Sequence, residues 1–189
     1  GYSASGIVLE TGREMTAVRP GDRVAVSEEC HSQYVCTGEN HLHRLESDTM
    51  NLQDAALGFI GTFPLAAIRK CRLEIGEPAM VMGQGVLGRI AVQLLRAAGA
   101  VPVIAVDPLA SKRETALRFG ADAALDPNEP DFAKKVRELM HGGVKVAIEV
   151  TGVGKALDQA LDCMQRFGRV ALLGCTRNSN FTIDYYRKV

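Results

Sequence analysis

The sequence predicts an α/β protein in which helices cover both faces of a doubly wound parallel sheet, with a smaller β-rich region before it. Two observations support this prediction. From residue 51 onward, short apolar strands alternate with helices of about ten residues, which gives βαβ units and therefore a parallel sheet. Before residue 50, short β-rich runs are separated by turns, which is typical of part of a barrel or sandwich.

The β-rich region has a turn whose chemistry is clear. In Pro20-Gly21-Asp22, proline presets φ at the first corner and glycine accepts a positive φ at the next. Apolar and β-branched residues flank this turn on both sides. We expect strands over residues 7–9, 23–26 and 33–36.

The α/β region begins with a helix over 52–73, which we expect to break near 61–64 because glycine and proline interrupt it there. Gly99 is the expected end of the helix that follows the first strand, and Ser111 the expected cap of the next one. The expected strands are 79–82, 101–106, 121–125, 144–150 and 169–173. The expected helices are 86–98, 111–119, 131–140 and 155–165.

Composition argues against several classes of partner. Lysine plus arginine and aspartate plus glutamate both number 22, so the formal net charge is zero and gives no overall attraction to nucleic acid or anionic lipid. No apolar run reaches the roughly 18 residues of a membrane span, and the start does not resemble a signal peptide. Scattered cysteines favour free thiols in the cytoplasm. They are Cys30, Cys36, Cys71, Cys163 and Cys175.

A glycine turn is the strongest functional motif. Residues 83–88 read Gly-Gln-Gly-Val-Leu-Gly and fit G-x-G-x-x-G between a predicted strand and a predicted helix. In this pattern Gly83 allows the tight bend, Gly85 leaves room for a pyrophosphate, and Gly88 lets helix and strand approach closely. The free N–H groups at the start of the helix then face an anionic ligand.

An acid closes the next strand. Asp107 lies 24 positions after Gly83, near the offset of about 20 expected for a residue that accepts hydrogen bonds from the ribose hydroxyls of a dinucleotide. Its charge would repel a 2′-phosphate, so the sequence favours NAD(H) over NADP(H). Lys112 and Arg113 are the counter-argument, because either could pair with such a phosphate. The alternatives are an ordinary turn aspartate at 107 and a solvated helix lysine at 112.

With these residues in place, the chain resembles the medium-chain dehydrogenase/reductase superfamily, and within it the zinc-type alcohol dehydrogenases. The matching segments, in order, are 6–8, 20–24, 57–62, the glycine turn, 120–122, 149–152 and 172–174. The resemblance implies that residues 1–50 are the C-terminal part of a GroES-like catalytic domain and 51–189 a Rossmann NAD-binding domain. It also implies a fragment, inactive alone, without the last sheet strand and the closing helices.

Further site residues follow from the resemblance alone. Val86 and Leu87 would offer backbone N–H groups to the pyrophosphate, and Lys112 would lie near the adenosine ribose. The nicotinamide side would be lined by Thr62, Val150, Gly174 and Cys175. For Val150 and Gly174 the alternative is packing at the ends of strands.

The zinc ligands of the family do not match. Where zinc enzymes read Gly-His-Glu, this chain reads Gly1-Tyr2-Ser3, and a second ligand position falls near Leu57-Gly58, which cannot bind metal. The four-cysteine lobe for structural zinc is also missing between residues 27 and 33. We therefore expect no zinc. Tyr2, in the place of the histidine, could donate a hydrogen bond to substrate; a packing tyrosine is the favoured interpretation.

Weaker candidates are set aside. Cys30, His31, Cys36, His41 and His43 lie close in sequence, but their spacing fits no C-x-x-C zinc pattern. Residues 152–155 lack the first glycine of a P-loop, and no histidine adjoins Cys175. The carboxylate pairs Glu28 with Glu29 and Asp122 with Asp126 are interpreted as solvated charges.

The predicted function is hydride transfer between NAD(H) and a small alcohol or carbonyl substrate, without zinc. No catalytic acid or base is assigned. One alternative is a quinone or enoyl reductase of the same superfamily, and another is a dinucleotide-binding module without catalysis. The expected partner is a small molecule, with neither nucleic acid nor membrane, and a homodimer through an uncovered sheet edge is compatible with the sequence.

Overall fold

The computed structural model describes residues 2–27, 31–175 and 181–188. The chain divides into two compact units, Gly1–Thr62 and Phe63–Val189. The domain boundary expected at residue 50 stays a prediction.

The first unit contains a three-stranded antiparallel sheet with β2 in its centre. Its core is formed by Val18, Val24 and Val26. The strands are β1 (Ser3–Ile7), β2 (Arg23–Ser27) and β3 (Leu42–Arg44). The described part of this unit also contains a short 3₁₀ turn (Glu39–His41), α1 (Leu52–Ala55) and the first residues of α2 (Gly58–Lys70), which continues into the second unit.

The strand expected at 33–36 is wrong. The structure has no strand there, and β3 pairs with the second edge of β2 instead. Tyr34 and Val35 are 69% and 38% exposed. A β-rich run without a buried face has nothing to pack against, so its propensity does not produce a strand.

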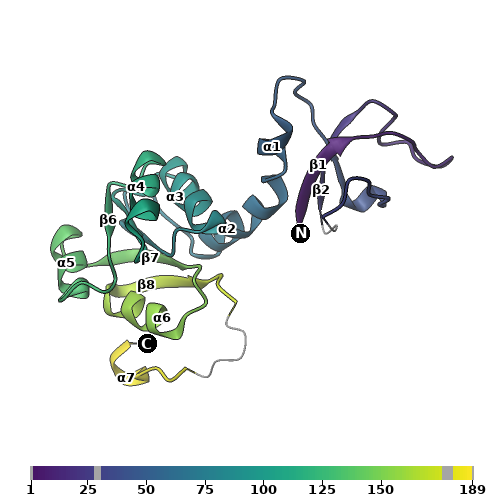
Figure 1. Ribbon diagram of the computed structural model, residues 1–189. Coiled ribbons are helices and arrows are strands. Elements are labelled where there is room, and N and C mark those ends of the chain that lie inside the picture. The colour runs from purple at the N-terminus through teal and green to yellow at the C-terminus, as the bar shows by residue number, and fades with distance from the viewer. Residues whose placement is uncertain (1, 28–30, 176–180, 189) are drawn as a thin grey trace. The chain divides into compact units, whose positions relative to one another are not determined.

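The second unit contains a five-stranded parallel sheet in the order β6-β5-β4-β7-β8. A doubly wound parallel sheet is the fold class that the sequence predicts, and Figure 1 shows β7 and β8 side by side within it. The strands are β4 (Ala79–Met82), β5 (Val103–Val106), β6 (Ala123–Leu125), β7 (Val144–Glu149) and β8 (Met164–Leu172). The helices are α2 (Gly58–Lys70), α3 (Val86–Ala97), α4 (Ala110–Arg118), α5 (Phe132–Leu139), α6 (Gly154–Asp162) and α7 (Tyr185–Lys188).

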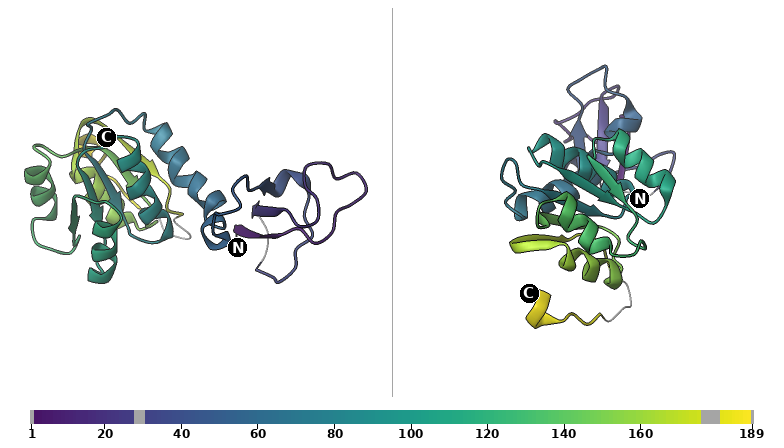
Figure 2. Two further views of the ribbon diagram at one scale, coloured as in Figure 1. Left: turned by 90° about the horizontal axis from the view of Figure 1, so that it is seen from above. Right: turned by 90° about the vertical axis from the view of Figure 1, so that its left-hand side faces the viewer.

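Helices cover both faces of this sheet because its strands are apolar on both sides. Ala79 and Val81 of β4 pack with α3, α4 and the end of α2, whereas Met80 and Met82 face α5 and α6. Figures 1 and 2 show these two helix layers with the sheet between them. All four β4 side chains are at most 1% exposed, which is the burial expected of a central parallel strand. None of the helices in the described part of the chain is long and apolar enough to cross a membrane.

Helix boundaries differ from the sequence prediction in several places. The helix expected over 155–165 ends at Asp162, and residues 164–165 belong to β8 instead. The expected break at 61–64 is wrong: the chain breaks at residues 56–57, and Pro64 lies buried inside α2. The next turns of α2 bury Ala67 and Ile68 in the core, and this packing outweighs the local cost of proline. The cap expected at Ser111 is also wrong, because α4 begins one residue earlier and Leu109 is its N-cap, without a side-chain bond.

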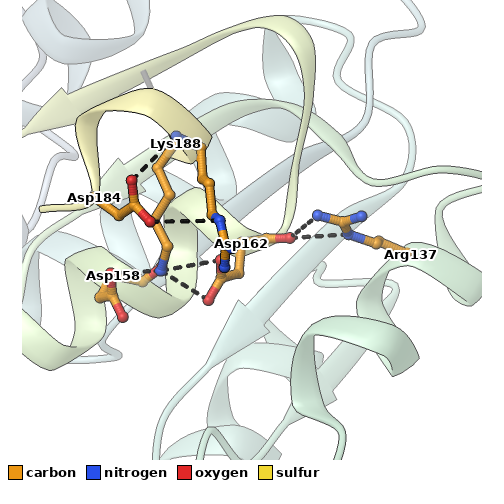
Figure 3. A network of polar contacts seen from close by, with 6 residues as sticks. Arg137, Asp158, Asp162, Asp184 and Lys188 are labelled. Atoms are coloured by element: carbon orange, nitrogen blue, oxygen red, sulfur yellow. Dashed lines mark hydrogen bonds and ion pairs between the residues drawn. The ribbon is translucent and has the colours of Figure 1, made fainter.

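The last described helix, α7, is joined to α6 by charges. The Nζ of Lys188 lies 2.5 Å from Oδ1 of Asp158 and 3.0 Å from the carboxylate of Asp162. Arg137 of α5 donates from Nε to the carbonyl oxygen of Asp162 at 2.9 Å. Figure 3 shows these contacts near the C-terminal end of α6. The negative end of the helix dipole also favours cations there.

Candidate dinucleotide-binding site

The glycine turn lies at the point where the sheet changes direction. From β4 the chain builds β5 and β6 on one side, then returns to build β7 and β8 on the other. The N–H of Gly83 donates to the carbonyl of Val106 at 2.7 Å, and the N–H of Val150 donates to that of Met82 at 3.0 Å. The turn is therefore fixed beside the crevice at the carboxyl ends of the strands, where open α/β sheets bind ligands.

Each glycine of the turn has a different environment. Gly83 has φ +96°, and a Cβ there would lie 2.7 Å from Cγ2 of Thr151. A Cβ on Gly88 would lie 1.9 Å from the carbonyl oxygen of Gly83, so only glycine allows this helix to approach the strand. Gly85 is exposed, and a Cβ there would meet nothing within 4 Å. The middle glycine thus leaves open space above the turn, as a bound pyrophosphate requires.

The start of α3 presents donors to that space. Gly85 is the N-cap and makes no side-chain cap bond. The first amides of an α-helix have no carbonyl partner one turn earlier, so those of Val86 and Leu87 are available to an anion. The pyrophosphate-binding role that the resemblance implies for both residues stays a prediction.

Asp107 connects the glycine turn to the end of β5. Its carboxylate is 4% exposed; Oδ2 accepts the N–H of Gln84 at 2.8 Å, and Oδ1 accepts that of Leu109 at 2.9 Å. The Nζ of Lys112 lies 3.7 Å from Oδ2. Each carboxylate oxygen has a second lone pair, so the residue can hold the turn and still accept a ribose hydroxyl.

Arg113 is engaged by neighbouring acceptors. Its Nη1 donates to the carbonyl oxygens of Asp107 and Pro108 at 2.7 and 2.8 Å, and to Oδ2 of Asp126 at 3.2 Å. The interpretation of Asp126 as a solvated charge is therefore wrong, because its side chain is only 22% exposed and paired. Asp122 is likewise paired, with Arg96 at 3.0 Å.

Of the residues expected on the nicotinamide side, those in the second unit lie together at the carboxyl ends of β7 and β8. Val150 follows β7, and the N–H of Gly174 donates to the carbonyl of Glu149 at 2.8 Å. A Cβ on Gly174 would lie 2.1 Å from the nitrogen of Gly152, and one on Gly152 would lie 2.6 Å from the carbonyl oxygen of Cys175. Cys175 is exposed. Thr62 belongs to the first unit, where its hydroxyl donates to the carbonyl of Phe59 at 2.7 Å.

Two buried polar residues at the site were missed by sequence reasoning. Glu149 is 2% exposed, and its carboxylate accepts the N–H and hydroxyl of Thr151 and the N–H of Gly152. Gln84 is fully buried: its Nε2 donates to the carbonyl of Val81, while Oε1 is buried without a partner. For Glu149 the available signal was an acid that ends the apolar strand β7, because such a residue stays buried only when the following turn satisfies it.

The donor set for a metal does not assemble. Over residues 2–27, 31–175 and 181–188, no group of three or more histidine, cysteine or acidic side chains could hold a metal ion. His31, Cys36, His41 and His43 are therefore not brought together as ligands, and Cys30 lies outside the described residues. Tyr2 is 60% exposed, and both interpretations of this residue stay predictions.

Comparison with known proteins identifies the family of this chain. Residues 86–186, more than half of the chain, match the family model described as zinc-binding dehydrogenase. The chain belongs to this family. This zinc-binding dehydrogenase homologue therefore lies within the medium-chain dehydrogenase/reductase superfamily, and its first unit corresponds to part of the GroES-like domain.

Similar proteins are longer than this family member. It is 39% identical over 111 residues to an L-threonine 3-dehydrogenase of Pyrococcus horikoshii, covering 58% of this chain and 32% of that protein. It is 30% identical to an (R,R)-butanediol dehydrogenase of Bacillus subtilis, covering 92% of this chain and 57% of the relative. The chain thus spans between about a third and three fifths of these relatives.

The fold agrees with solved structures. A Sinorhizobium meliloti protein described as a zinc-binding dehydrogenase, solved with NADP bound, superimposes with a TM-score of 0.88 at 24% identity. The match covers 97% of this chain and 63% of that one. At this identity the likeness establishes the fold: a Rossmann sheet preceded by part of a GroES-like domain.

Proposed function

We propose that the protein is an NAD(H)-dependent oxidoreductase of the alcohol dehydrogenase type, which transfers hydride between nicotinamide and a small alcohol or carbonyl substrate. The observation that supports it most is the glycine turn. Open space at Gly85 lies over the amides of Val86 and Leu87, and the buried carboxylate of Asp107 lies at the adjoining strand end.

The residues fit a dinucleotide in two places. The start of α3 binds the pyrophosphate through backbone N–H groups, because these donors have no partner within the helix. Asp107 accepts hydrogen bonds from the adenosine ribose and repels a 2′-phosphate, which supports NAD(H) over NADP(H). The NADP-bound Sinorhizobium structure has the same fold, so cofactor choice depends on local side chains.

Bound NAD(H) supplies the hydride chemistry, and this chain supplies orientation. Val150, Gly174 and Cys175 line the nicotinamide side, since they gather at the carboxyl ends of the strands beside the glycine turn. Thr62 is proposed for the same side on the basis of the family resemblance. The names of the two relatives, an L-threonine and a butanediol dehydrogenase, support a small hydroxylated or carbonyl substrate.

We also propose that the reaction does not use zinc. Tyr2 and Leu57 stand at positions where the zinc enzymes have ligands, and neither side chain can replace them. Metal analysis of the purified protein is expected to find well under one zinc per chain, with turnover unaffected by a chelator. One zinc per chain together with inactivation by the chelator would contradict this part.

The proposal also covers the cellular compartment and the oligomeric state of the protein. Cys36, Cys71, Cys163 and Cys175 are free in the described part of the chain, which supports the reducing cytoplasm as location. Among the described strands β8 is paired on one side only, and such an edge supports a homodimer. Light scattering measures the mass that decides between monomer and dimer.

The experiment that tests the function combines binding and turnover. NADH is titrated into the protein by calorimetry, and the full-length protein is then assayed with a panel of small alcohols and carbonyl compounds. We expect saturable NADH binding and NAD(H)-linked turnover of at least one compound. Binding without any turnover would favour a dinucleotide-binding module, and no binding would refute the proposal.

A further inference from the structure

We propose that the ion pair between Arg113 and Asp126 sets cofactor selectivity, by holding the Arg113 guanidinium away from the place that a 2′-phosphate would take. This inference rests on the proposed binding of NAD(H) at Asp107. It goes further by assigning a positioning role to two residues that do not themselves contact the ribose.

The pair lies next to the ribose-binding acid. Asp107 follows β5 and Asp126 follows β6, and these two strands are neighbours in the sheet. The N–H of Asp107 donates to the carbonyl of Leu125 at 3.2 Å, so the two acids lie at the same edge of the sheet. Arg113 comes from α4 and reaches both strand ends. Its Nη1 contacts the Asp107 carbonyl at 2.7 Å and the Asp126 carboxylate at 3.2 Å.

The Asp126 carboxylate is held from the other side as well. Its Oδ1 accepts the N–H of Asn128 at 2.9 Å, while Oδ2 faces Arg113. The side chains of Arg113 and Asp126 are only 21% and 22% exposed. A partly buried pair fixed at both ends restrains the guanidinium more firmly than an exposed surface pair would.

The charges around the ribose site are therefore balanced in two pairs. Lys112 lies 3.7 Å from Asp107, and Arg113 lies 3.2 Å from Asp126. A 2′-phosphate brings close to two negative charges into this set. Each of the two cations already faces a carboxylate, so the phosphate gains little attraction there. Without the charge of Asp126, Arg113 would keep only neutral carbonyl partners and could turn to the phosphate.

The test uses Asp126→Asn in the full protein. Asparagine keeps the oxygen that accepts the Asn128 N–H and keeps the side-chain shape, but it removes the charge that faces Arg113. Dissociation constants for NADH and NADPH are measured by fluorescence titration, and thermal unfolding is followed without cofactor. We expect NADPH to bind about three- to tenfold more tightly, with NADH affinity nearly unchanged.

Two further variants separate selectivity from stability. In the double variant Asp126→Asn with Arg113→Met, the gain toward NADPH should disappear, because the freed guanidinium is gone. Asp122→Asn breaks the Arg96 pair, which lies 3.0 Å apart at the amino end of the same strand β6. The Asp122→Asn variant should have a lower melting temperature, but the ratio of its dissociation constants for NADH and NADPH should equal that of the wild type.

The outcomes are distinct. An unchanged ratio in Asp126→Asn, while the wild type binds NADH, overturns this inference and leaves the proposed function standing. An equal change of the ratio in Asp122→Asn also overturns it, because the effect would then be general. If the wild type binds neither NADH nor NADPH, the proposed function fails, and the selectivity role fails with it.

Discussion

The Cα of Gly88 lies so close to the Gly83 carbonyl that a Cβ on Gly88 would be 1.9 Å from that oxygen. At this point the first turn of α3 and the turn that follows β4 approach each other through their backbone atoms. Gly85, the N-cap of α3 three residues earlier, has open space on its Cβ side. The same motif thus contains one glycine required by packing and one required only if a ligand is bound.

Gly88→Ala is expected to destabilise the fold. The added methyl group would collide with a backbone oxygen that cannot move without displacing β4, and overpacking of this kind costs about 3 kcal/mol. Urea unfolding followed by circular dichroism measures the loss. A free energy of unfolding equal to that of the wild type would contradict the packing described for α3 and β4.

Gly85→Ala is expected to leave stability within about 1 kcal/mol of the wild type, because its φ of −75° suits alanine and no atom lies in the way. The methyl group would instead occupy the space of the pyrophosphate, so NADH affinity should fall at least about tenfold. Calorimetric titration with NADH gives the affinity. Undiminished binding would place the cofactor somewhere other than over this turn.

Cysteine reactivity provides an independent check of burial. Desolvation raises the pKa of Cys163 to about 12, and it also raises the pKa of Cys71, whereas Cys36 and Cys175 are exposed. At pH 8 we expect iodoacetamide to modify Cys36 and Cys175 quickly, and the two buried thiols only after unfolding. Peptide mass mapping measures the extent of modification at each cysteine.

The same labelling tests the nicotinamide side. NADH should slow modification of Cys175 but not of Cys36, since only Cys175 is proposed to line the cofactor. Equal rates at Cys175 with and without saturating NADH would remove it from the site. Cys36 is the matched control, because it is also exposed but belongs to the other unit.

Arg169 and Glu77 should make stability depend on pH. Arg169 of β8 donates to both Glu77 oxygens, at 2.8 and 2.5 Å, and to the carbonyl of Cys71 at 2.7 Å. The hydrogen bonds from Arg169 to the Glu77 carboxylate hold the pKa of Glu77 below its ordinary value of 4.5. A carboxylate with a lowered pKa stabilises the fold above its unfolded-state pKa, and this contribution is lost as the pH falls through the lower folded-state value.

Glu77→Gln should therefore be less stable than the wild type at pH 7, by about 1–3 kcal/mol. The difference should shrink as the pH falls below 4.5, the ordinary pKa of this carboxyl. Urea unfolding over a pH series measures it. Glu74→Gln is the control, because Glu74 is exposed, and its stability should follow the wild type. A constant difference at every pH would refute the role of the Glu77 charge.

The parallel sheet and glycine turn could be predicted because their signals are local. Strands such as β4 are apolar throughout, and the spacing of Gly83, Gly85 and Gly88 matches a backbone requirement of a single turn. The acid at 107 follows from the same short pattern. These features depend on residues within about 25 positions of one another, so periodicity and turn chemistry are sufficient.

The remaining features depend on contacts that the sequence does not display. Pro64 inside α2 is tolerated because residues further along the helix are buried, and residues 33–36 form no strand because no neighbour covers them. The pairing of Arg113 with Asp126 joins α4 to the end of β6. The sequence shows that Arg113 lies near the ribose-binding acid, but only the structure shows that its partners are the residues after β5 and β6.

The most direct test of the account is an amide NMR spectrum of the ¹⁵N-labelled protein during titration with NADH. We expect the largest shift changes at the N–H groups of Gly85, Val86 and Leu87, with smaller changes at Asp107, because the pyrophosphate would rest on the start of α3. Shift changes confined to other segments, or a spectrum that stays the same at saturating NADH, would contradict the assignment of this turn as the cofactor site.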